Sequence, residues 1–340
     1  VADVPYLGGP SADALRANRE QVQSNELRIL NPNGYDNPLT HQVSLGVQRQ
    51  FGGEHLFYVD LIHTRTFNQF RLRDLNAPAP YSITADELEA AQQDPERSPA
   101  DLVRSSEAAD ATRPVAPVPG GAKRIIMTET AGEARYYAAN VNLIKDRGDD
   151  AYAYRLSYTL SRLRNNTEDI NFLAEDANDF EDEWGPSVND RTHVISAVGS
   201  VYPLDGLSVT LAALIQSGQP LTRVPDAAVF GTRDLNGDGL ARSSDFLGNG
   251  DRWPSAARNG DRLPWSETFD LGVQYAFPVA GGRVVARADV FNVFNTKNLS
   301  GFANNATQSN QIQVGPPGAE IVKKNAGPPR QFQFGLRYEF

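Results

Sequence analysis

The last ten residues, Gln331-Phe-Gln-Phe-Gly-Leu-Arg-Tyr-Glu-Phe340, alternate large apolar side chains with polar or small ones. This period of two predicts a β-strand with one apolar and one polar face. The strand ends on an aromatic residue, so we expect a lipid bilayer to cover its apolar row. The alternative is the terminal strand of a soluble β-sandwich.

The same stretch resembles the C-terminal signal of bacterial outer-membrane barrels. The resemblance is carried by a polar residue, a glycine and two terminal aromatics, which are here Gln333, Gly335, Tyr338 and Phe340. It implies that the barrel-assembly machinery pairs with this final strand.

Composition narrows the class of protein. The 340 residues contain no cysteine, which excludes disulfides and thiolate metal sites. The net charge of -10 argues against a nucleic-acid partner, because phosphate contacts need a basic face. No run of about 18 apolar residues predicts a membrane-spanning helix. A barrel wall remains possible, because its alternating polar residues mask the apolar ones.

Eight more segments upstream show the same alternation. They are centred on residues 43–51, 56–66, 137–143, 154–160, 193–202, 207–217, 269–277 and 284–294. In segment 193–202 apolar residues occupy both parities, which leaves its lipid-facing side unassigned. Short connections alternate strictly with long polar inserts, the first of which contains a predicted short helix at 85–93. The fold prediction is all-β: about nine antiparallel strands forming the C-terminal portion of a large transmembrane barrel, with long extracellular loops and short periplasmic turns.

Aromatic residues predict the orientation of the barrel. Phe51, Tyr202, Tyr275 and Tyr338 end strands at one level, as expected for an interfacial girdle. The C-terminus and the short turns are therefore predicted to be periplasmic, in the outer membrane of a Gram-negative bacterium. The predicted organisation is an extracellular loop segment at 1–40 and a barrel wall at 41–340, with extracellular loops at 67–134, 164–191, 218–265 and 295–329.

An odd number of strands predicts missing partners. Bacterial single-chain barrels have an even number of strands and close on themselves so that no edge faces lipid. We therefore expect further N-terminal strands, in the same gene product or in a separate chain.

Several motifs together resemble TonB-dependent outer-membrane receptors of the Oar-like branch. These are Thr40-His-Gln-Val-Ser-Leu-Gly-Val-Gln-Arg49, Arg73-Asp-Leu-Asn-Ala-Pro78, Gln216-Ser-Gly-Gln-Pro-Leu-Thr222, Asp234-Leu-Asn-Gly-Asp-Gly239 and Asp289-Val-Phe-Asn-Val-Phe-Asn295. The resemblance implies a barrel of about 22 strands around an N-terminal plug. It also implies import driven by the inner-membrane TonB complex.

One loop has the spacing of a calcium site. Oxygen-bearing residues at loop positions one, three and five, a glycine at six, a backbone carbonyl at seven and a carboxylate at twelve match the EF-hand pattern. The candidate ligands are Asp234, Asn236, Asp238, Leu240 and Asp245. The terminal Asp resembles the dockerin variant, although Arg242 at position nine cannot bind a cation. The alternative is a turn cluster without metal, since Asx and Gly residues favour turns anyway.

The segment 168–183 is rich in acidic residues and contains the rings of Phe172 and Phe180. We interpret it as a solvated surface loop; the alternative is a patch that collects cations. No Ser-His-Asp arrangement, fixed carboxylate pair or phosphate-binding loop is present, so we do not expect an enzyme.

The sequence therefore predicts an outer-membrane TonB-dependent receptor that recognises a ligand with its extracellular loops and imports it through a plugged barrel. Two alternatives remain. One is a calcium-stabilised surface or adhesion protein without transport, and the other is a soluble secreted β-protein with a dockerin-like loop.

Overall fold

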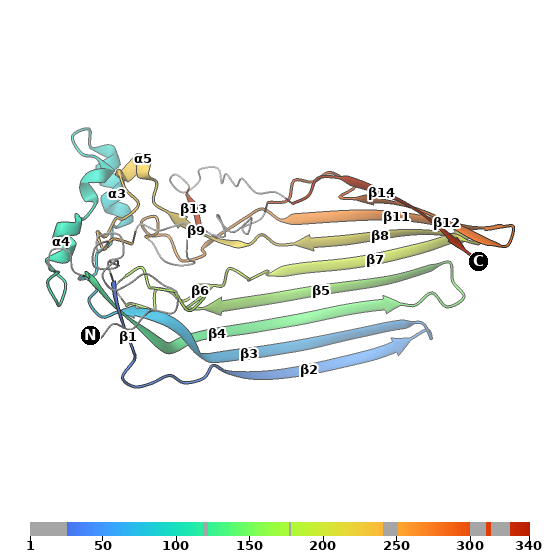
Figure 1. The fold of residues 1–340 in the computed structure, drawn as a ribbon, viewed down its shortest axis with the longest axis horizontal. Coiled ribbons are helices and arrows are strands. Elements are labelled where there is room, and N and C mark those ends of the chain that lie inside the picture. The colour runs from blue at the N-terminus through green and yellow to red at the C-terminus, as the bar shows by residue number, and fades with distance from the viewer. Residues whose placement is uncertain (1–25, 118–121, 177, 241–250, 300–310, 314–326) are drawn as a thin grey trace, which may run out of the picture.

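The computed structural model describes residues 26–117, 122–176, 178–240, 251–299, 311–313 and 327–340. Nine long strands form one antiparallel sheet in the order β14-β12-β11-β8-β7-β5-β4-β3-β2 (Figure 1). Their bounds are β2 (Leu39–Phe51), β3 (His55–Asp74), β4 (Arg124–Lys145), β5 (Tyr152–Asn165), β7 (His193–Leu204), β8 (Leu207–Gln216), β11 (Ser266–Val279), β12 (Gly282–Phe291) and β14 (Gln331–Glu339). Each strand pairs with its neighbours in the chain, so the predicted nine-stranded antiparallel wall is confirmed.

Strand register places the apolar parity of all nine strands on one face. One row across five strands consists of Val47, Val59, Val141, Tyr158 and Ile195. This row assigns the ambiguous segment 193–202, because Ile195 shares the face of Tyr158. The apolar face is open to the surroundings, with Phe334 79% and Leu336 78% exposed. A face of this kind suits contact with lipid rather than water.

The opposite parity is polar. Asp60, Asn140 and Thr159 occupy one such row in register. The Thr159 hydroxyl donates to Asn140 Oδ1 at 2.8 Å. Polar residues on this face suit the aqueous interior of a barrel.

The described part of the sheet is not closed. Strands β2 and β14 are its two edges, and all 13 residues of β2 are exposed. The four short turns lie at one end of the sheet together with the C-terminus (Figure 1). Two of these turns contain a glycine at φ +81°, Gly206 and Gly281, a conformation that favours glycine.

The β3–β4 hairpin extends well beyond the predicted strand ends. Strand β3 continues to Asp74 and β4 begins at Arg124, so the connection covers 75–123 instead of the predicted 67–134. The extension is stabilised across the strands by Glu129, which accepts from Arg71 Nε at 2.7 Å and from Arg73 Nε at 2.8 Å. A bulge near Gln69 separates this extension from the part of the hairpin that is nearer the short turns.

The long connections fold into a cap at the opposite end from the short turns (Figure 1). The cap contains β1 (Glu26–Ile29), α3 (Ala85–Gln93), η1 (Pro99–Leu102), α4 (Ser106–Asp110), β6 (Gly185–Pro186), β9 (Pro220–Val224), α5 (Ala227–Phe230), β10 (Asp261–Arg262) and β13 (Gln311–Gln313). Helix α3 begins with a capping box formed by Thr84 and Glu87. Within the described residues, no helix combines the length and the apolar character needed to cross a membrane.

The cap has its own hydrophobic core. Its largest cluster consists of Ile83, Leu88, Phe230, Leu235 and Trp253. The rings of Phe230 and Trp253 meet edge to face at 5.3 Å. The connections are therefore packed against one another, and polar side chains within them are held in fixed positions.

Candidate functional site

The predicted calcium loop forms a compact turn in the cap. Asp234 Oδ2 accepts from the backbone N–H of Gly239 at 2.9 Å, Asn236 Oδ1 from Asp238 N–H at 2.8 Å, and Asp238 Oδ1 from Leu240 N–H at 2.7 Å. Gly239, at loop position six, has φ +90°, as the tight turn requires. Asp245, at position twelve, lies outside the described residues.

A third carboxylate, Asp251, joins this loop. Ligand oxygens of Asp234, Asp238 and Asp251 all lie within 4.8 Å of one another. Asp251 is only 4% exposed and accepts through Oδ2 from the backbone N–H groups of Leu235 and Asn236. These bonds fix Asp251 against the turn, and we call Asp234, Asp238 and Asp251 the triad.

No arginine or lysine among the described residues forms an ion pair with the triad. Arg104 and Arg113 instead donate to the backbone carbonyls of Asn236 and Asp238. Burial, together with the nearby Asp234 carboxylate, raises the pKa of Asp238 to about 6. Burial also raises the pKa of Asp251 well above its usual value, as does the charge of Asp238. Three carboxylates in this setting repel one another unless protons or a cation neutralise them.

The triad fits a hard divalent cation. Asp234 Oδ1 is buried and makes no hydrogen bond. A cavity of about 210 Å³, lined by Asp251 and by the acidic Asp176 and Asp182, adjoins the triad. Carboxylate oxygens with no sulfur or imidazole donor favour calcium over zinc.

Sequence reasoning found Asp234, Asn236 and Asp238 but missed Asp251. Asp251 ends an Asn-Gly-Asp tripeptide at 249–251 that repeats the one at 236–238. The same tripeptide occurs again at 259–261, outside the triad, so the repeat alone does not identify Asp251. Asn236 and Leu240 stay predicted ligands, and Asn236 Oδ1 accepts a turn hydrogen bond here.

The acidic segment 168–183 is a solvated loop only in part: Asp179, Glu181 and Asp182 are exposed, as predicted, whereas Glu168 and Glu183 are not. The side chains of Glu168 and Glu183 are 3% and 1% exposed, because two arginines from the insert 218–265 neutralise them. Arg258 Nη1 lies 2.7 Å from Glu168 Oε1, and Arg252 Nη1 lies 3.1 Å from Glu183 Oε2. Arg258 also donates to the side-chain oxygen of Asn165 at 2.7 Å. This network joins two loops that are far apart in the sequence.

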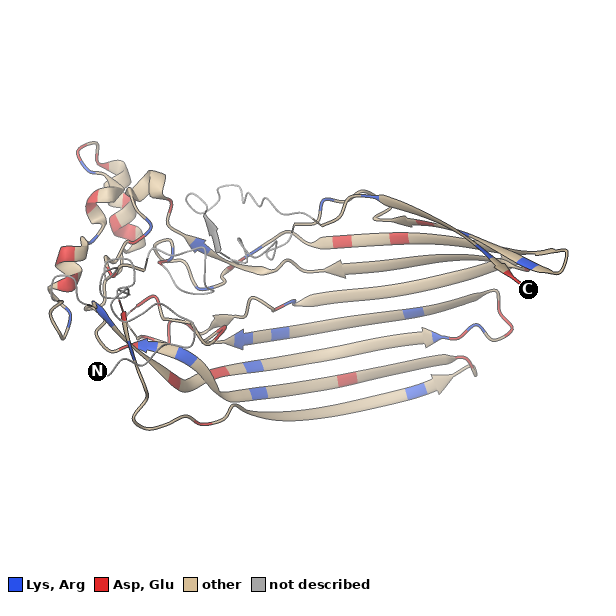
Figure 2. Cartoon of the chain, viewed as in Figure 1, with Lys and Arg blue, Asp and Glu red and all other residues tan. Residues whose placement is uncertain are grey.

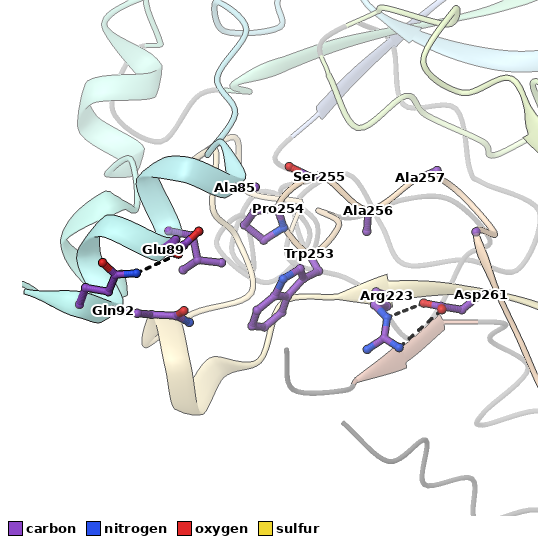
Figure 3. A pocket seen from close by; sticks show the side chains of 13 residues that line it. Ala85, Glu89, Gln92, Arg223, Trp253, Pro254, Ser255, Ala256, Ala257 and Asp261 are labelled. Carbon is purple, nitrogen blue, oxygen red and sulfur yellow. Dashed lines mark hydrogen bonds and ion pairs between the residues drawn. The ribbon is translucent and has the colours of Figure 1, made fainter. Parts of the chain in front are cut away.

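A second feature of the cap is a cavity of about 770 Å³ between α3 and the segment 253–261 (Figure 3). Trp253 lies on one wall, and Glu89 and Gln92 of α3 lie on another. Arg223 and Asp261 form an ion pair at the rim, with Nε 2.5 Å from Oδ2. The mixture of an aromatic wall with a few fixed polar groups is typical of small-molecule sites.

Three of the four predicted assembly residues lie on the edge strand β14, and Phe340 follows it directly. Gln333 pairs with Asp289, Gly335 with Arg287 and Tyr338 with Val284 of β12. The rings of Tyr338 and Phe340 lie 6.1 Å apart at the end of the strand.

Known proteins were compared with this fold. Among solved structures, the outer membrane transporter YddB from Escherichia coli has a TM-score of 0.50 at 9% identity, covering 91% of this chain and 33% of that one. The ferric enterobactin receptor PfeA from Pseudomonas aeruginosa has a TM-score of 0.49 at 13% identity, covering 90% and 32%. The siderophore receptor PirA from Acinetobacter baumannii has a TM-score of 0.49 at 12% identity, covering 92% and 33%. The chain thus spans about one third of each structure.

No curated protein matches the sequence. The predicted fold, a portion of an outer-membrane barrel, is confirmed, whereas the receptor function and the Oar-like branch stay predictions. The sequence profile described as outer membrane beta barrel domain matches residues 4–205. Because that match covers more than half of the chain, the protein belongs to the outer membrane beta barrel domain family.

Proposed function

We propose that this chain is part of a TonB-dependent receptor that recognises a ligand in its cap and imports it through the barrel. The observation that carries the proposal is the combination of an open barrel wall with a packed cap that contains the 770 Å³ cavity. The buried Arg258–Glu168 ion pair ties two loops of the cap together, so the cavity lies within a packed structure. A rigid cavity above a barrel suits selective capture from the outside.

The two open edges of the sheet indicate that the chain needs further strands as partners. Unpaired backbone groups on β2 and β14 are costly in hydrocarbon, so further strands must cover them in the membrane. We propose that these strands and a plug belong to the complete receptor, and that the TonB complex supplies the energy. In this arrangement the C-terminus and the four short turns are periplasmic, and the barrel-assembly machinery acts on β14.

We also propose calcium as a cofactor of the cap. Asp234, Asp238 and Asp251 would hold the ion, with water and backbone oxygens completing its coordination. When bound, the ion supplies positive charge that cancels the repulsion within the triad. The turn 234–240 and the residues before Trp253 would then be held together beside the cavity.

Transport is tested by uptake in cells that lack the gene and are complemented with the full-length protein. Ferric siderophores, oligosaccharides and peptides form the panel of probes. The expected result is uptake of one class that stops when a protonophore removes the energy source. Substitution of Trp253 by Ala should weaken it.

A calcium-stabilised surface or adhesion protein is the second candidate, favoured by the triad. It would bind a partner in a calcium-dependent manner but would import nothing. Calcium-dependent binding without energy-dependent uptake of any probe would therefore support this candidate and overturn transport.

A further inference from the structure

The apolar face of the wall becomes basic where the strands approach the cap. Register places His41, Arg65, Arg135 and Arg164 in one row across β2 to β5. The next row toward the short turns contains Val43, His63, Tyr137 and Arg162. Figure 2 shows the basic bands side by side on β3, β4 and β5. All these residues have the parity of Leu45, Leu61 and Leu160, which face lipid.

This patch carries uncompensated positive charge. Among the described residues, the one carboxylate that pairs with these four arginines is Glu133, which lies 3.0 Å from Arg65 Nη2 and 3.6 Å from Arg135 Nη2. Arg162 is exposed and forms no ion pair with any described residue. The whole chain has a net charge of -10, so the patch does not reflect a generally basic protein.

Aromatic rings accompany the arginines. The guanidinium of Arg135 lies 4.9 Å from the ring of Trp184, and that of Arg65 lies 4.3 Å from the ring of Phe67. Tyr137 stacks on His63 at 4.4 Å. Tyr and Trp rings prefer the level at which lipid headgroups meet hydrocarbon, so the patch lies at this level rather than in the hydrocarbon.

A groove of about 620 Å³ leads from the patch onto the apolar face. Its walls are the apolar side chains of Val43, Leu45, Leu61 and Leu160. The groove lies between them because the side chain of Ala139 is small. His63 and Arg162 line the end of the groove that is nearer the cap. The groove therefore joins a basic end to an apolar channel on one continuous surface.

We propose that this surface binds an anionic lipid of the outer leaflet, with its phosphorylated headgroup at Arg135 and Arg162 and an acyl chain in the groove. Arginine suits a phosphate because its guanidinium offers two parallel donors. A charged side chain directed at the membrane is costly without such a partner. This inference uses the orientation proposed above, with the cap outside, but does not require transport.

The test uses the full-length protein in detergent and measures lipid binding by native mass spectrometry. Diphosphoryl lipid A, phosphatidylglycerol and phosphatidylcholine are added separately. The wild-type protein should retain lipid A in preference to the other two. The double substitution Arg135→Gln with Arg162→Gln should weaken lipid A binding at least tenfold. Heat-modifiable migration shows that each variant is folded.

Two further variants separate the two parts of the site. Arg155→Gln removes one positive charge from β5, as the Arg162→Gln half of the double variant does, but on the opposite face and near the short turns, so lipid A binding should not change. Ala139→Phe fills the groove and should weaken binding of lipid A without changing a charge. Equal binding of all three lipids, or equal losses in the Arg155 and Arg135/Arg162 variants, would overturn the proposal. Preference for phosphatidylglycerol would overturn the outer-leaflet assignment while leaving transport untouched.

Discussion

The buried Oδ1 of Asp234 accepts no hydrogen bond from any described residue, and Asp251 is the residue that completes the triad. Replacing Asp251 by Asn removes one charged ligand while keeping an acceptor for the N–H groups of Leu235 and Asn236. We expect calcium affinity to fall by about tenfold or more, because affinity depends on the number of charged ligands. Terbium luminescence sensitised by the nearby Trp253 measures this affinity.

The matched control is Asp261→Asn. Asp261 also ends an Asn-Gly-Asp tripeptide, at 259–261, but it pairs with Arg223 and lies outside the triad. Its substitution should leave terbium binding unchanged. Equal losses in both variants would count against the triad as the site.

Burial raises the pKa of Asp238 to about 6, so we expect the stability of the cap to depend on pH. Without calcium, folded Asp238 holds its proton to a higher pH than unfolded Asp238 does, so stability falls as pH rises from about 4 to above 6. Calcium replaces the proton, so this fall should disappear and calcium affinity should increase across the same range. Thermal unfolding against pH, in chelator and in calcium, measures both effects. Parallel curves would rule out linkage between the ion and these carboxyl groups.

Only part of the triad was predictable from the sequence. The spacing of Asp234, Asn236 and Asp238 is local and belongs to a known turn pattern. Asp251 is held by backbone N–H groups of the turn, which every sequence provides. No side-chain pattern therefore marked it, apart from the repeated tripeptide.

At the scale of elements, Arg258 connects the insert 218–265 to the acidic segment. It reaches Glu168 and Asn165, and its side chain is 2% exposed. Substitution of Arg258 by Met would leave Glu168 buried without its cation. We expect the cap to lose about 3–5 kcal/mol of local stability, the usual cost of removing one partner of a buried pair. Limited proteolysis of residues 166–190 measures this local unfolding.

Arg97→Met is the control for this prediction. Arg97 is exposed in the same cap, so its loss should leave the rate of cleavage unchanged. If Arg97→Met and Arg258→Met were cleaved at the same rate, the buried network would not be what holds the loop.

Strands and loops differed in how well the sequence predicted them. A strand such as β14 can be recognised from the sequence because its period of two is contained in ten consecutive residues. The partners Arg258 and Glu168 are 90 positions apart, and nothing local distinguishes a buried Glu from a solvated one. The same reason explains the hairpin extension, since Arg71 and Arg73 meet Glu129 only after β3 and β4 pair.

At the scale of the whole molecule, the decisive feature is that nine strands share one apolar face and leave two edges open. Short turns set the register of four of the strand pairs, such as β11–β12, and in every pair a slip by one residue would turn polar side chains toward lipid. The sequence predicted this arrangement because both the alternation and the turn lengths are local. The way in which the remaining barrel closes on β2 depends on strands outside this sheet.

The last prediction concerns assembly of the barrel through β14. Replacing Tyr338 and Phe340 by Ala removes two rings from the end of the edge strand without removing a backbone hydrogen bond. If this strand is the signal read by the assembly machinery, the folded fraction in the outer membrane should fall severalfold, as measured by heat-modifiable migration of the full-length protein. Phe277→Ala is the matched control, because Phe277 lies in the same row as Val284 and Tyr338 but two strands away. A loss of interfacial ring contacts would reduce folding in both variants, whereas a specific signal would reduce it only in the β14 variant.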